Sequence, residues 1–199
     1  KSRVIPECTG LYWHSSSKVN EYEHMIMHTS TMGFDDYLEC RKFVLIIMIF
    51  HNTRLLKNIY KFLDHQNIKR SVFFREIFNA SLASETFAPV FNDFIELTKQ
   101  ELFDKDIVPE DADLEEITSN KIYKFLSIAL MKYKTSLVEI VSTALNNPTI
   151  EIDKEEVQFF IEMFKNRFMN DIVTDREIVT KSFPQKISDV FGSKKYECF

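Results

Sequence analysis

Residues 33–51, GFDDYLECRKFVLIIMIFH, combine a helix start with the longest apolar run of the chain. Gly33 can serve as the N-cap, with Asp36 at the N3 position and Asp35 beside it to complement the helix dipole. The apolar run over residues 43–50 is far shorter than the roughly 18 residues needed to cross a bilayer. This stretch therefore predicts a capped helix whose apolar half lies in a protein core.

Apolar residues at helical spacing continue towards the C-terminus. Further helices are predicted between breaks at residues 52–53 and 66–67, around residues 72–78, from about residue 84 to 102, over residues 119–145 and from Asp153 to about 170. Pro89 should kink the helix that contains it or delay its start. The helix over residues 119–145 should be the longest, because one apolar stripe runs through it until Asn146-Asn147-Pro148.

The two ends of the chain have a different pattern. Residues 19–29 are predicted to form a strand within an N-terminal hairpin or edge, residues 104–116 an acidic connector, and residues 177–183 a short C-terminal strand. The predicted fold is therefore mainly α, a multi-helix bundle with a short N-terminal strand or hairpin and a short C-terminal strand. We expect a strand and loop segment over 1–31, a helical domain over 32–170 and a C-terminal extension over 171–199.

The composition is that of a globular protein. Of the 199 residues, 45% are hydrophobic and 28% charged, and 19 Phe supply large side chains for a core. Only 3 Gly and 5 Pro leave few sites for tight turns, which favours long helices. A net charge of -5 provides no overall basic surface, so neither nucleic acid nor a membrane is expected as a main partner.

The cysteines indicate a reducing compartment. Cys8, Cys40 and Cys198 are odd in number and widely spaced, and Cys40 falls within an apolar pattern where a thiol behaves as a small hydrophobe. No signal peptide opens the sequence, which starts without a methionine. We therefore expect a cytoplasmic chain that is a portion of a longer protein.

Histidines and carboxylates near the first helix allow two interpretations. His24 and His28 would share a helix face as metal ligands, but on a strand their backbones are about 13 Å apart, which favours ordinary polar strand residues. Asp35, Asp36 and Glu39 could form a general acid and base set. Helix capping explains the two aspartates without any chemistry and is the favoured interpretation.

Other candidate sites have similarly simple explanations. Arg41 and Lys42 could contact an anion, although a charge beside an apolar stripe is usually a solvated flank or a local ion pair. Phe-rich stripes could line a ligand cavity but are far more often core. The sequence has no Gly-rich phosphate loop, G-x-S-x-G, H-E-x-x-H or C-x-x-C motif. It therefore predicts no catalytic residue, cofactor-binding residue or metal ligand in this chain.

A resemblance adds to these predictions. Residues 21–37, EYEHMIMHTSTMGFDDY, followed by ECRKF at 39–43, resemble a passage in radical S-adenosylmethionine (radical SAM) proteins that carry an N-terminal cobalamin-binding domain. In that family a strand ending in a Thr-Ser-Thr-like sequence leads to a capped helix with an Asp and then an Arg. Residues 3–6, RVIP, also resemble the Arg-containing strand that closes the family's catalytic barrel.

The resemblance implies that the main chemistry lies upstream of residue 1. There a C-x-x-x-C-x-x-C loop would hold a [4Fe-4S] cluster that cleaves S-adenosylmethionine, with cobalamin in a preceding domain. The residues of this chain that match the motif, and that would lie at the domain junction or on the substrate side, are Arg3, Thr29, Asp36 and Arg41. Gly33 stands where a Ser-like cap is typical, and His28 where an acidic residue is expected.

The resemblance leads to one functional hypothesis, and the composition allows another. The first is a C-terminal helical accessory domain of an iron-sulfur, cobalamin-type radical SAM enzyme, which packs on the catalytic barrel and has no catalysis of its own. The second is an autonomous all-α protein–protein interaction module with an apolar groove for a partner helix or peptide.

Overall fold

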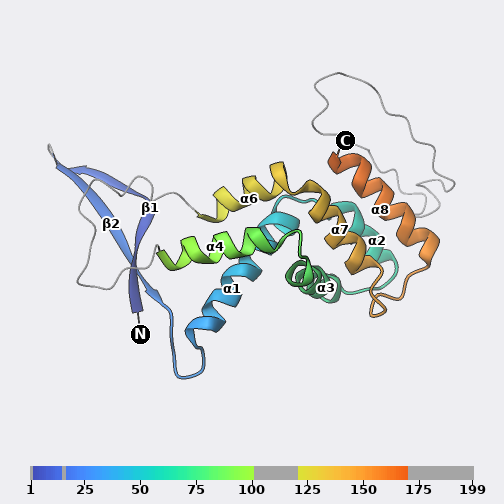
Figure 1. The fold of residues 1–199 in the computed structure, drawn as a ribbon, viewed down its shortest axis with the longest axis horizontal. Coiled ribbons are helices and arrows are strands. Elements are labelled where there is room, and N and C mark those ends of the chain that lie inside the picture. Colours follow the sequence, from blue (N-terminus) through green and yellow to red (C-terminus); the bar gives the residue numbers. More distant parts are fainter. Residues whose placement is uncertain (1, 15–16, 101–120, 170–199) are drawn as a thin grey trace, which may run out of the picture. The chain divides into compact units, whose positions relative to one another are not determined.

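The computed structural model describes residues 2–14, 17–100 and 121–169, and within these ranges the chain is mainly α-helical (Figure 1). The strands are β1 (Ser2–His14) and β2 (Ser17–Ile26). The helices are α1 (Phe34–Ile46), η1 (Ile47–Asn52), α2 (Lys57–His65), α3 (Arg70–Ala83), α4 (Ala88–Gln100), α6 (Lys121–Lys132), α7 (Lys134–Leu145) and α8 (Lys154–Met169). None of these helices is long and apolar enough to cross a membrane.

The N-terminal strands form an antiparallel hairpin, as predicted. Ser2 pairs with Ile26 at one end and His14 with Ser17 at the other, and the register shifts between Pro6 and Leu11. The second strand ends at Ile26 and does not reach residue 29, the predicted limit. A local turn takes over there, in which the Thr29 amide donates to the Met32 carbonyl at 2.9 Å. The predicted C-terminal strand and the acidic connector lie outside the described residues.

The first helix begins where the sequence indicates. The Gly33 amide donates to Asp36 Oδ2 at 2.7 Å, which is the carboxylate half of a capping box. The helix passes into the π-helical segment η1, in which Ile49 and Phe50 are fully buried. Phe43 and Val44 keep 38% of their surface exposed, so the apolar run buries one face only.

The chain divides into two compact units that each draw on separate parts of the sequence. The divisions fall after Ile49, Ala88 and Met131. The first unit contains the hairpin, α1, α4 and α6, whereas the second contains α2, α3, α7 and α8. The predicted segments 1–31, 32–170 and 171–199 follow sequence order alone and stay a prediction.

Phe94 lies at the centre of the helical part of the first unit. Its buried ring on α4 meets the Phe125 ring of α6 edge-on, with centroids 5.4 Å apart. The Arg41 guanidinium of α1 lies over the same ring, 5.6 Å from its centroid. Three helices therefore converge on one aromatic side chain.

The second unit is built around α7, which packs against both α3 and α8. Phe62 of α2 and Phe160 of α8 are fully buried and stack with centroids 4.0 Å apart. A part-buried hydrogen bond also links α3 to the loop after α7, in which Asn147 Nδ2 donates to Glu76 Oε2 at 2.7 Å. The Phe-rich stripes of this unit are therefore core, as predicted.

The prediction of a single helix over residues 119–145 is wrong. The backbone breaks at Tyr133, with φ −115° and ψ 27°, so that α6 ends at Lys132 and α7 begins at Lys134. The Tyr133 ring meets Phe87 edge-on at 6.1 Å, and the two helices belong to different units. A tertiary contact therefore accompanies the break, and the helical pattern of the sequence does not mark it. The longest described helix is instead α8, with 16 residues.

Two other helix starts agree with the sequence. Helix α4 begins at Ala88, so Pro89 lies in its first turn, where its missing amide costs no hydrogen bond. Asp153 caps α8, because its Oδ1 accepts from the Glu155 amide at 2.8 Å.

Candidate functional site

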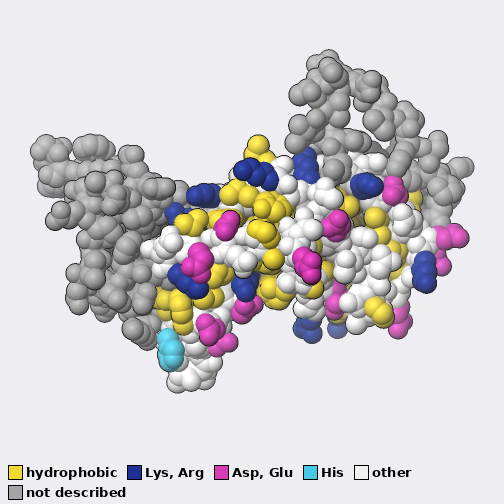
Figure 2. Space-filling view, in the orientation of Figure 1, with side chains coloured by type: hydrophobic (Ala, Val, Ile, Leu, Met, Phe, Trp, Pro, Cys, Tyr) yellow, Lys and Arg dark blue, Asp and Glu magenta, His cyan; other side chains and the backbone are white. Residues whose placement is uncertain are grey.

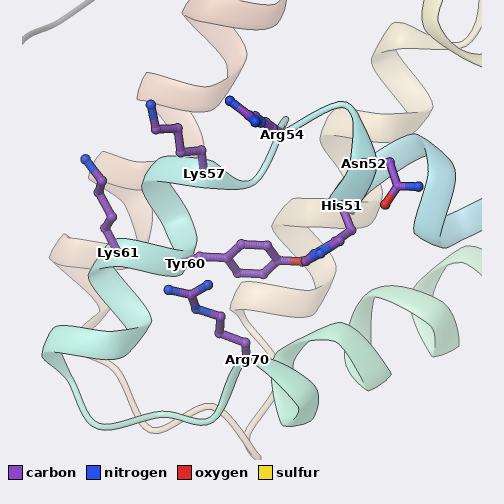
Figure 3. A pocket seen from close by; sticks show the side chains of 7 residues that line it. All are labelled: His51, Asn52, Arg54, Lys57, Tyr60, Lys61 and Arg70. Carbon is purple, nitrogen blue, oxygen red and sulfur yellow. The ribbon is translucent and has the colours of Figure 1, made fainter.

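A polar pocket of about 420 Å³ lies in the second unit, where η1 ends and α2 and α3 begin (Figure 3). All the side chains that line it are polar, and none is acidic. They are His51, Asn52, Arg54, Lys57, Tyr60, Lys61 and Arg70. Four of the seven are Lys or Arg, so the pocket is strongly cationic within an acidic chain.

The Tyr60 ring lies between His51 and Arg70 (Figure 3). Its hydroxyl is 3.4 Å from His51 Nδ1, and the Arg70 guanidinium lies 5.3 Å from the ring centroid. Burial raises the pKa of Tyr60 to about 12, and the charge of Arg70 opposes this rise only in part. Tyr60 is therefore a neutral hydroxyl at physiological pH.

An ion pair fixes the orientation of Arg70. Its Nε donates to Asp64 Oδ1 at 2.9 Å, and its Nη2 donates to Asp64 Oδ2. The hydrogen bond from Arg70 holds the pKa of Asp64 below its usual value. These contacts use two of the three guanidinium nitrogens and leave Nη1 outside the ion pair.

The loop before α2 sets the position of Arg54. This residue has φ 60°, a left-handed conformation that a non-glycine residue adopts at a cost of about 1 kcal/mol. Two backbone hydrogen bonds hold the turn, from the Arg54 amide to the His51 carbonyl at 3.0 Å and from the Lys57 amide to the Arg54 carbonyl at 3.1 Å. The loop thus places a cation beside the first residue of α2.

The arrangement is suited to binding an anion. Guanidinium, ammonium and hydroxyl groups donate hydrogen bonds to oxyanions. The lining contains no carboxylate that would repel an anion. Across the part of the chain that the structure describes, no group of three or more His, Cys, Asp or Glu could hold a metal ion.

The four residues singled out from the sequence do not lie in this pocket. Arg3 belongs to β1, opposite Met25, and its side chain lies outside the described residues. Thr29 Oγ1 accepts hydrogen bonds from the amides of Thr31 and Met32, at 3.2 and 3.0 Å. Thr29 therefore stabilises the turn that leads into α1.

Asp36 and Arg41 are engaged within the first unit. Asp36 caps α1 through Gly33, as the capping interpretation predicts. The Arg41 guanidinium lies over the buried Phe94 ring, so Arg41 packs against the helical core of this unit. Lys42 forms the predicted local ion pair, with Glu39 at 2.6 Å. The structure thus brings Thr29 and Asp36 to the start of one helix.

Cys40 corrects one prediction. The apolar pattern around it suggested a buried thiol, but Cys40 is free and exposed. It falls on the solvent side of α1, whereas Leu45 and Ile46 face the core. The side chains of Cys8 and Cys198 lie outside the described residues. His28 is exposed and follows the end of β2, and the His24 side chain lies outside the described residues.

The basic pocket was not predicted from the sequence. Lys57 and Lys61 are four apart and therefore share one face of α2. Arg54 precedes this face, and Arg70 follows it at the start of α3. Basic residues at that spacing, around a helix without acidic residues in its first turn, are the signal that could have indicated the site.

Comparison with known proteins identified no relative of this chain. No protein-family model, curated protein or solved structure matches this chain. Functional inference therefore depends on the residues themselves.

Proposed function

We propose that this chain is the C-terminal helical accessory region of a cytoplasmic radical SAM enzyme of the cobalamin-binding type. In this proposal it packs on the catalytic barrel of the same protein and has no catalysis of its own. The [4Fe-4S] cluster, S-adenosylmethionine and cobalamin belong to the upstream part of that protein. Arg3, Thr29, Asp36 and Arg41 lie at or near the junction.

One observation supports the proposal most directly. Within the described residues β1 and β2 form a sheet of two strands, so each strand pairs along one edge only. A two-stranded hairpin is marginally stable by itself in water, and an unpaired edge is a template for a further strand. The hairpin is therefore suited to continue a larger sheet such as the end of a barrel.

The order of local elements is consistent with the resemblance. The strand β2 leads through the Thr29 turn to the capped helix α1, and Arg41 follows on that helix. The same order, a strand, a Thr-Ser-Thr-like turn and a capped helix with an Asp and then an Arg, marks the family passage.

The reading frame upstream of Lys1 provides the first test. The proposal requires a C-x-x-x-C-x-x-C loop there. A start codon close to Lys1 without such a loop would rule it out and favour the autonomous interaction module.

Amide hydrogen exchange provides the second test, because it measures whether the strands gain a pairing partner. If the longer protein contains the barrel, the amides of β1 and β2 should exchange much more slowly in it than in the isolated chain, because a new edge is paired. The α8 amides are the internal control, since the proposal predicts no new pairing there. Equal protection of the hairpin in both proteins would contradict the proposal.

A further inference from the structure

We propose that the basic pocket of the second unit binds a small, multiply charged phosphate compound through Arg54, Lys57, Lys61 and Arg70. The pocket and the orientation of these side chains are shown in Figure 3. This inference is independent of the proposed function, because it concerns a site that the radical SAM resemblance does not include.

The pocket concentrates positive charge in a chain that is acidic overall. The chain as a whole has a net charge of -5, yet four Lys or Arg side chains line one pocket without an acidic lining residue. Lys57 shares a helix face with Lys61, four residues later. Arg54 and Lys57 are exposed and have no acidic partner among the described residues. A bound anion would balance the charges of Arg54 and Lys57.

The helix ends add positive potential at the same place. Lys57 is the first residue of α2 and Arg70 the first of α3. Neither helix has a side-chain cap or an acidic residue in its first turn. The N-terminus of a helix carries a partial positive charge, so a cation there is unfavourable and an anion is favoured. At the α3 end Asp64 balances the charge of Arg70, whereas at the α2 end Lys57 has no such carboxylate within the described ranges, and a negatively charged ligand would balance it.

The geometry supplies directional donors as well as charge. Asp64 and the Tyr60 ring orient Arg70, and its Nη1 lies outside the ion pair with Asp64. Arg54 is placed by a turn with two backbone hydrogen bonds. Phosphate oxygens accept several such hydrogen bonds at once, which makes a phosphate a better match than a single carboxylate.

The size and setting favour a small ligand over a polymer. A volume of about 420 Å³ lies within the range of small-molecule sites. A nucleic-acid backbone requires an extended basic track. On the face drawn in Figure 2, Lys and Arg side chains are instead mixed with Asp and Glu.

Calorimetric titration of the full chain with pyrophosphate, at low and at physiological salt, tests the proposal. One saturable site is expected, weaker at higher salt because the cations are exposed. Arg54→Gln and Lys57→Gln should each weaken binding roughly fivefold, since each removes one charge contact. Both side chains are exposed, so an unchanged thermal unfolding midpoint should show that the fold is kept.

Lys165→Gln is the matched control. Lys165 is exposed on α8, is not part of the pocket lining and carries the same charge. Its replacement should leave pyrophosphate affinity nearly unchanged. If Lys165→Gln lost as much pyrophosphate affinity as the pocket variants, the effect would come from net charge alone, and this would overturn the proposal. So would the absence of saturable binding, or binding of vesicles with phosphoinositide headgroups or of single-stranded RNA without any binding of pyrophosphate.

Discussion

Asn67 ends α2 in a left-handed conformation, with φ 57°. The Ile68 amide donates to the Leu63 carbonyl at 2.8 Å and the Asn67 amide to the Asp64 carbonyl at 3.2 Å, which together form a Schellman motif. Asparagine tolerates this conformation, and glycine tolerates it without a steric cost.

Substitution of Asn67 should therefore separate backbone strain from side-chain contacts. Asn67→Ala should lower the free energy of unfolding by about 1 kcal/mol, because a Cβ-bearing residue without a local hydrogen bond is strained there. Asn67→Gly is the control and should be neutral or slightly stabilising. Urea denaturation measures both, and equal destabilisation by the two variants would contradict the role of φ.

The pKa of Tyr60 predicts a specific response to alkaline pH. Burial raises this pKa to about 12, whereas an unfolded tyrosine titrates near 10. The folded protein thus holds the phenol proton over a range where the unfolded chain has lost it. The contribution of Tyr60 to stability is complete below about pH 10 and is lost as the pH rises towards 12.

Urea denaturation of the wild-type protein and of Tyr60→Phe checks this sign. Between pH 9 and pH 11 the wild-type protein should lose more stability than the variant, because phenylalanine has no proton to release. The comparison cancels the titration of the other tyrosines and of the lysines. Parallel loss in both proteins would show that Tyr60 titrates normally.

Among the elements, the stacked pair Phe62 and Phe160 joins α2 to α8. Both rings are fully buried, and their centroids are 4.0 Å apart. Replacement of either ring by alanine should destabilise the fold by about 3–5 kcal/mol, through lost burial and a new cavity.

A double-mutant cycle with Phe62→Leu and Phe160→Leu isolates the stacking itself. The coupling energy should be about 0.5–1.5 kcal/mol beyond the single effects. Lys165→Ala combined with Phe62→Leu is the control, because the Lys165 side chain of α8 is exposed and should not couple to a fully buried ring. A coupling energy near zero for the two phenylalanines would contradict a direct contact between these helices.

Local signals predicted the helix ends better than the helix connections. Asp153 and Asp36 cap helices through contacts within three residues, so their roles can be read from the sequence. At the break Tyr133 contacts Phe87, which lies far away in the chain, and helical periodicity continues through it. Cys40 shows the related difficulty, since a mixed apolar pattern leaves open which side of the helix faces the core.

The basic pocket could not be predicted for a similar reason. Its residues come from the end of η1, a loop, α2 and the start of α3, and only the folded chain brings them together. The sequence showed the breaks between these elements but not the direction in which the chain turns. The positive φ of Arg54, which sets that direction, has no glycine to mark it.

For the whole molecule, the radical SAM proposal places the iron–sulfur cluster outside this chain. A [4Fe-4S] cluster needs several cysteine thiolates close together. Cys8, Cys40 and Cys198 are far apart in sequence, and Cys40 is exposed and free. If the chain is an accessory region, any cluster must belong to another part of the protein.

Anaerobic reconstitution with iron and sulfide should therefore leave the isolated chain without a stoichiometric cluster. Iron analysis and visible absorption measure the uptake, and Cys40→Ser is the matched variant. Wild type and variant should behave alike, and in the untreated folded protein Cys40 should react readily with a thiol reagent because it is exposed. Stoichiometric uptake that Cys40→Ser abolishes would show instead that the fold assembles a cluster site from its distant cysteines, and an accessory role without a cofactor would then be untenable.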